Sequence, residues 1–206
     1  MQSKRYPSGI VSALLETDMV TPPTRAALTE RLNKEPIAVP RFFDEATFAT
    51  LRAVCSRLVP QPDRVQPIDL AGPIDGRLAQ GEGDGWRYDQ MPPDGEAHRR
   101  GLQALDESAR LLCDASFAEL DDRRQDEILL LVQRDEVSGG LWETMQASRF
   151  FEELLAGATE SYYSHPLAQE EIGYVGMADA HGWQAIGLNE LEPWEPKALE
   201  GAHDEA

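Results

Sequence analysis

The chain has 206 residues, enough for one domain with a sizeable core or for one domain with long arms. It contains 19 Lys and Arg but 37 Asp and Glu, which gives a net charge of −18. This charge repels phosphate backbones and anionic lipids, so nucleic-acid binding is excluded as an expected function. Hydrophobic residues make up 41%, too many for a disordered chain, and no apolar stretch is long enough to predict direct membrane insertion.

The first 43 residues are predicted to form an N-terminal arm with one short helix. Thr21 suits the N-cap of this helix and Pro22 its first turn. The apolar run at residues 10–15 is too short for a secretory signal, and the basic pair before it is not a twin-arginine pair. The chain alone is therefore expected to be cytoplasmic, and periplasmic if a partner carries it.

Apolar stripes at helical spacing dominate the middle of the chain. They predict five helices, over about 45–58, 68–80, 96–112, 121–134 and 144–164. Asp44 and Asp121 are suitable N-caps. Leu112 and Leu155 are assigned to buried stripes, and the continuous apolar run 128–132 predicts a central helix.

Strand signals are nearly absent. The predicted fold is all-α, an irregular bundle of about five or six helices with long ordered loops and extended terminal arms. We expect an arm at 1–43, a helical domain at 44–190 and an acidic C-terminal tail at 191–206.

The Gly-rich stretch at 81–85 is predicted to be a turn inside a longer loop. Acidic side chains separate its glycines and no Lys follows, so it would repel phosphate rather than cradle it. Trp86 and Tyr88 are expected to pin the loop. Cys55 and Cys113 both lie on predicted apolar helix faces, which favours buried thiols and leaves a disulfide open.

The histidines are the first candidates for chemistry. His98 lies beside two arginines and is expected on a solvated helix flank, and His203 lies in the tail. His165 precedes a proline at a helix end, where it can cap the last carbonyls of that helix.

A metal site is an alternative interpretation of the C-terminal half. It would combine His165 with Glu170, Glu171 or His181, although no spacing places two such ligands on one helical face. Asp179 could orient the imidazole of His181. No Ser or Cys nucleophile lies in a recognisable motif, so no catalytic residues are predicted.

The stretch 147–187 is the most informative part of the chain. An aromatic-rich helix stops at a proline and leads into an irregular segment that is poor in charge and rich in Gly and aromatic residues. Such a segment predicts a surface that a partner covers. The expected interface residues, for which core packing is the alternative, are Tyr162, Tyr163, Tyr174, Trp183 and Trp194.

Five segments carry a family resemblance through their order and spacing. They are Leu51–Pro60, Gly101–Asp106, Phe117–Asp121 with Gln125–Leu129, Phe150–Leu155 running to Tyr162–Pro166, and Gly182–Trp183 with Ile186–Gly187. Together they resemble the family typified by gluconate 2-dehydrogenase subunit 3, over roughly residues 42–190.

The resemblance implies a non-catalytic small subunit of a dehydrogenase complex. The large subunit would be a flavoprotein of the glucose-methanol-choline (GMC) type that carries FAD and oxidises a sugar, sugar acid or polyol. A cytochrome c subunit often takes the electrons. No cofactor is then expected on this chain. The alternatives left open are a metal-dependent enzyme using His165 and His181, and a general acidic interaction protein with salt-dependent binding.

Overall fold

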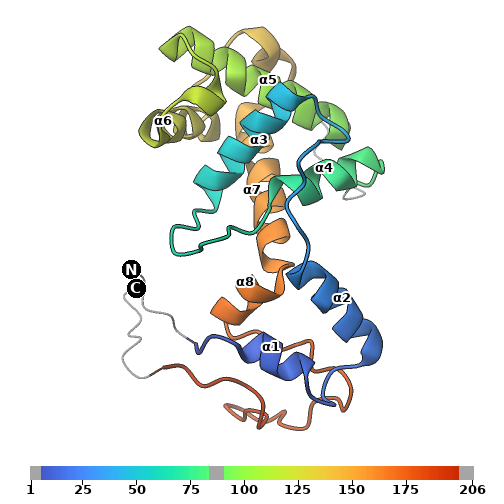
Figure 1. The fold of residues 1–206 in the computed structure, drawn as a ribbon. Coiled ribbons are helices and arrows are strands. Elements are labelled where there is room, and N and C mark those ends of the chain that lie inside the picture. The colour runs from blue at the N-terminus through green and yellow to red at the C-terminus, as the bar shows by residue number, and fades with distance from the viewer. Residues whose placement is uncertain (1–5, 84–90, 200–206) are drawn as a thin grey trace. The chain divides into compact units, whose positions relative to one another are not determined.

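The computed structural model describes residues 6–83 and 91–199 (Figure 1). Within these ranges the chain forms eight α-helices and two short 3₁₀ helices and no strand, which confirms the all-α prediction. Trp86 and Tyr88, which were expected to pin the loop that contains the Gly-rich stretch, and His203, which was expected in the tail, lie outside the described residues.

The contacts divide the chain into two compact units. We call Pro36–Tyr162 the central unit. The terminal unit combines the part of the chain up to Glu35 with the part from Tyr163 onward, so both chain ends contribute to one unit. The boundaries of a functional arm, domain and tail stay a prediction.

The central unit contains the five helices predicted for the middle of the chain. They are α3 (Glu45–Leu58), α4 (Ala71–Ala79), α5 (Asp94–Cys113), α6 (Asp122–Gln133) and α7 (Ala147–Tyr163), whose last residue is counted with the terminal unit. Two short 3₁₀ helices that were not predicted, η1 (Phe117–Glu119) and η2 (Gly140–Thr144), also lie in it. Asp44 accepts a 2.7 Å hydrogen bond from Thr47 N, and Asp121 a 2.9 Å bond from Arg124 N. Both predicted N-caps are therefore confirmed.

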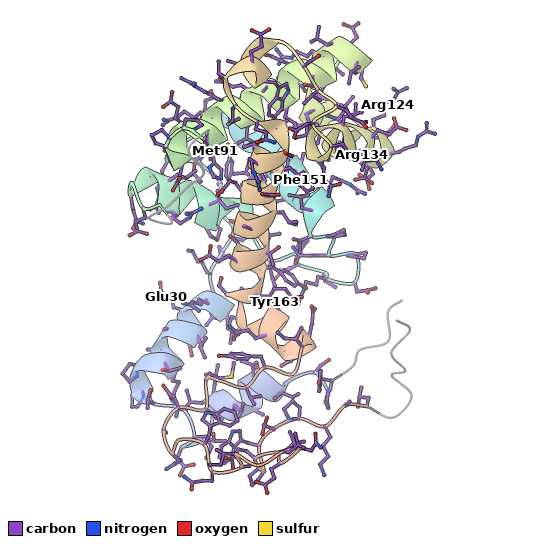
Figure 2. The ribbon with its side chains drawn as sticks, turned by 180° about the vertical axis from the view of Figure 1, so that it is seen from behind. Glu30, Met91, Arg124, Arg134, Phe151 and Tyr163 are labelled. Atoms are coloured by element: carbon purple, nitrogen blue, oxygen red, sulfur yellow. The ribbon has the colours of Figure 1, made fainter. Side chains whose placement is uncertain are left out.

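Phe150 of α7 lies at the centre of this unit and is fully buried. Its ring centroid is 5.9 Å from that of Trp142 and 6.3 Å from that of His98. The Trp142 indole N–H donates to Ser108 Oγ at 3.0 Å, which satisfies the buried polar end of the indole. Phe151, the next residue, lies among the side chains of the neighbouring helices (Figure 2).

Asp75 anchors the segment before α3 onto α4. Its side chain is completely buried and accepts hydrogen bonds from three successive backbone amides. The distances are 2.7 Å from Arg41 N, 3.0 Å from Phe42 N and 3.1 Å from Phe43 N. A buried carboxylate is stable here because the chain supplies it with donors.

His98 is buried, so its predicted position on a solvated helix flank is wrong. Its side chain is 2% exposed, and Nδ1 lies 2.8 Å from the Asp94 carbonyl oxygen. Gly101 explains the burial, because it lies three residues further along α5 on the same face and lets the Phe150 ring approach the helix. The two arginines beside His98 occupy other faces of α5.

Three leucines that the sequence assigned to the core are exposed: Leu112 by 57%, Leu130 by 41% and Leu155 by 39%. Helix α6 is therefore half-buried rather than central, since its apolar run is wider than its buried face. Leu112 lies in the last turn of α5, and Leu155 lies at the edge of the stripe centred on Phe150 and Leu154. Both cysteines are free. Cys55 is buried as expected, and burial raises its pKa to about 12, whereas Cys113 is only half-buried.

The terminal unit contains α1 (Ile10–Leu15), α2 (Pro22–Leu32) and α8 (Pro166–Glu171). In Figure 1 the orange-red segment after α8 runs alongside α1. The sequence predicted α2 but neither α1 nor α8, which are each too short to show a helical period. Its small core consists of Val11, Leu14, Leu15, Val20, Leu28, Val175 and Met177.

Candidate partner interface

We call residues 172–199 the C-terminal strip. It contains no helix or strand, and polar contacts at its start fix its path. Near the end of α8, just before the strip, the Glu170 carboxylate accepts from Gly9 N at 2.8 Å and from Val11 N at 3.0 Å. These amides belong to the first turn of α1, where a carboxylate satisfies donors that the helix leaves free.

Asp179 performs the same role for α2. It accepts from Thr21 N at 2.8 Å, from Thr21 Oγ1 at 2.9 Å and from Thr24 Oγ1 at 2.6 Å. The expectation that Asp179 orients His181 is therefore wrong, because its carboxylate is engaged with α2; His181 Nε2 lies 3.7 Å from Asp18 Oδ2. These hydrogen bonds lower the pKa of Asp179 from 3.8 to about 2, and the bond from the Thr21 amide has the largest effect.

This shift predicts an acid-dependent loosening of α2. A carboxyl group whose pKa is lower in the folded state stabilises that state above its unfolded pKa, and the contribution disappears as pH falls from about 4 through about 2. Amide-exchange protection is expected to fall across this window at Thr21, whose amide donates to Asp179, and at Arg25, whose amide donates to the Thr21 carbonyl oxygen. The fall is expected to be smaller in Asp179→Asn. Asp18→Asn, at an 89% exposed side chain, is the control. Identical pH profiles for Asp179→Asn and the parent chain would contradict the assignment.

The predicted interface residues differ in exposure. Tyr162 is 8% exposed and packs inside the central unit, with the Arg64 guanidinium 5.8 Å from its ring centroid. Tyr163, at the end of α7 in Figure 2, is 42% exposed. Tyr174 is 50% and Trp183 41% exposed. Tyr162 thus follows the core-packing alternative, whereas the other three present side-chain surface.

Trp194 joins the strip to the core of the terminal unit. It is partly buried against that core, and its ring meets Trp183 edge-on with centroids 5.9 Å apart. The structure therefore brings two of the five predicted residues together. Trp194 is the half-buried member of this pair, and Trp183 is the exposed one.

Sequence reasoning missed the aliphatic part of this surface. Its most exposed members are Ile186 (87%) and Leu188 (93%), and further aliphatic side chains with at least 44% exposure are Ile172, Leu191 and Leu199. The usable signal was two aliphatic residues flanking Gly187 in a segment without periodicity, since aliphatics in an irregular segment have no helix face to bury them.

The strip and the end of α8 are strongly acidic. One lysine, Lys197, accompanies the acidic residues Glu170, Glu171, Asp179, Glu190, Glu192 and Glu195. We call these acidic residues the acidic frame of the strip, because the exposed apolar side chains lie among them in the sequence. A region of negative charge favours a partner surface of positive potential.

His165 caps the start of α8, a helix that the sequence did not predict. Its Nδ1 accepts a 3.2 Å hydrogen bond from Leu167 N. In the parts of the chain that the structure describes, no cluster of three or more His, Cys, Asp or Glu is arranged to hold a metal ion. Among the same residues, no helix combines the length and apolarity needed to cross a membrane.

The fold and the strip define a helical protein with an exposed apolar surface. A family model described as gluconate 2-dehydrogenase subunit 3 matches residues 45–188, from the start of α3 to Leu188. This match covers more than half of the chain, and the chain belongs to that family, whose name denotes a subunit of a dehydrogenase complex. Comparisons with curated proteins and with solved structures gave no significant match.

Proposed function

We propose that this chain is a non-catalytic accessory subunit that binds and stabilises the catalytic subunit of a sugar, sugar-acid or polyol dehydrogenase. In this proposal the partner is a GMC-type flavoprotein that carries FAD, and this chain carries no cofactor. A cytochrome c subunit would be a further member of the complex. The compartment follows from the partner, which could carry the chain to the periplasm.

The observation that carries the proposal is the C-terminal strip. Tyr174, Trp183, Ile186 and Leu188 are each at least 41% exposed on one short segment. Several exposed apolar side chains on one segment favour a site of interaction, because their exposure to water costs free energy that a partner recovers. The family membership identifies the kind of complex in which such a partner is found.

The terminal unit supplies a second argument. Its small core joins α1 and α2 to Val175 and Met177 of the strip, so few apolar side chains hold the two chain ends together. A core of this size gives limited stability, and units of low local stability are often completed by binding. A partner that covers the strip would add burial where the unit has least.

The test is coexpression of the chain with a GMC-type flavoprotein encoded beside it. The two chains are expected to co-elute in a stoichiometric complex with a flavin absorbance spectrum. Trp183→Ala is expected to weaken the complex about tenfold, as for a residue that contributes strongly to an interface. Elution of this chain as a separate soluble monomer, with no flavoprotein attached, would overturn the proposal.

A further inference from the structure

Residues 184–192 form a loop that a buried carboxylate closes. Glu192 is 5% exposed, and its Oε1 accepts hydrogen bonds from Gln184 N and, at 2.7 Å, from Ala185 N. The backbone amide of Glu192 itself donates to Glu195 Oε2 at 2.6 Å. The two ends of the loop are thus fixed to each other by side-chain to backbone hydrogen bonds.

The tip of the loop is a turn with its own internal hydrogen bonds. Gly187 N donates to Glu190 Oε2 at 3.1 Å, and Glu190 N donates to the Gly187 carbonyl oxygen at 3.2 Å. A Cβ at position 187 would lie 2.6–2.8 Å from the Glu190 carboxylate, so a side chain there would displace this carboxylate from the Gly187 amide. Asn189 adopts a left-handed conformation, with φ of 61°.

The turn displays two aliphatic side chains with almost no cover. Ile186 is 87% and Leu188 93% exposed, on either side of Gly187. A preformed loop loses little conformational entropy on binding, so the burial of its apolar side chains is converted efficiently into affinity. Apolar side chains that enter a desolvated pocket contribute most of the affinity in many interfaces.

We propose that the loop 184–192 anchors the chain to the catalytic subunit, with Ile186 and Leu188 inserted into an apolar pocket bordered by Arg or Lys. The inference rests on the proposed function and names the surface and the chemistry of its partner. The acidic frame of the strip, with Glu190 in the turn itself, is the complement of a cationic border. A second copy of this chain would present the same acidic frame and be repelled.

The test compares the affinities of two double variants for the purified catalytic flavoprotein by calorimetry. Ile186→Ser with Leu188→Ser is expected to weaken binding at least about a hundredfold. The control, Leu111→Ser with Leu112→Ser, changes two aliphatic residues of the central unit that are 83% and 57% exposed, and is expected to bind within about threefold of the parent chain. Circular dichroism checks that both variants keep the parent's helicity.

Two further arms test the preformed turn and the charge. Gly187→Val retains both aliphatic side chains but displaces Glu190, and is expected to weaken binding at least about tenfold. Raising the salt concentration from about 0.05 M to about 0.5 M is expected to weaken binding about tenfold. Salt-independent binding would overturn the cationic border, and a Gly187→Val variant with parental affinity would overturn the role of the preformed turn.

The outcomes separate the two proposals. If the parent chain binds and Ile186→Ser with Leu188→Ser binds equally well, or if both double variants lose affinity equally, the anchor is wrong and the accessory function stands. If the parent chain itself does not bind the flavoprotein, the proposed function fails, and the anchor fails with it.

Discussion

Replacement of Asp75 by Ala is expected to lower the free energy of unfolding of the central unit by about 3–5 kcal/mol. The substitution removes the acceptor of the Arg41, Phe42 and Phe43 amides. Each buried donor left without an acceptor costs about 1–3 kcal/mol, and amides near the surface recover part of this from water. The released segment also holds Phe43, which is buried in the core.

Urea unfolding followed by far-UV circular dichroism measures this effect. Asp75→Asn keeps an acceptor oxygen at the same place and is expected to lose less, about 1–2 kcal/mol. The exposed Asp63 provides the matched control, since Asp63→Ala should change stability by no more than about 0.5 kcal/mol. Equal stabilities of Asp75→Ala and Asp63→Ala would show that the hydrogen bonds of Asp75 do not stabilise the central unit.

The second large effect is expected at Gly101, where substitution by Ala should cost about 2–3 kcal/mol. A Cβ at this position would lie 2.2–2.4 Å from three atoms of the Phe150 ring. The ring is held by Trp142 and His98 on other sides, so it has little room to retreat. The gain in helix propensity, about 1 kcal/mol, does not offset such a clash.

Gly76 in α4 supplies a control with the same chemical change. No atom lies within 4 Å of a Cβ built at Gly76. Gly76→Ala is therefore expected to raise the free energy of unfolding by about 0.5–1 kcal/mol, through helix propensity alone. We therefore expect Gly101→Ala to lower the free energy of unfolding and Gly76→Ala to raise it in the same urea experiment. Changes of the same sign would contradict the packing described for α5 and α7.

Helix positions in the central unit were predictable because their signals are local. Asp44 and Asp121 mark starts that depend on hydrogen bonds within a few residues. The burial of His98 was not predictable, because it depends on the approach of Phe150 from a helix about fifty residues further along the chain. Periodicity likewise could not identify Leu112 as exposed, since the core ends before the helix does.

The candidate interface was predictable in location but not in detail. Composition directed attention to the segment after α7, and its exposed aromatic residues Tyr174 and Trp183 lie there. Side-chain identity could not separate them from Tyr162, because aromatic residues serve cores and interfaces equally well. The exposure of Ile186 and Leu188 could not be predicted, because it depends on a turn. Glu190 and Glu192 hold this turn by accepting hydrogen bonds from backbone amides.

Two carboxylates of the α8 end and the strip also explain why both chain ends form one unit. Glu170 satisfies amides at the start of α1, and Asp179 satisfies donors at the start of α2. The acidic residues of this region therefore divide into those that hold its own fold and those that face a partner. Charge alone, read from the sequence, does not reveal this division.

The central claim is that this chain stabilises a flavin-bearing catalytic subunit. The most direct measurement is the temperature at which the flavoprotein, purified alone or with this chain, releases its flavin and becomes fluorescent. Because a ligand that binds only the folded state stabilises it by mass action, the release temperature is expected to rise when this chain is added, and to rise further with its concentration. A release temperature that stays the same at every concentration of this chain would contradict the account.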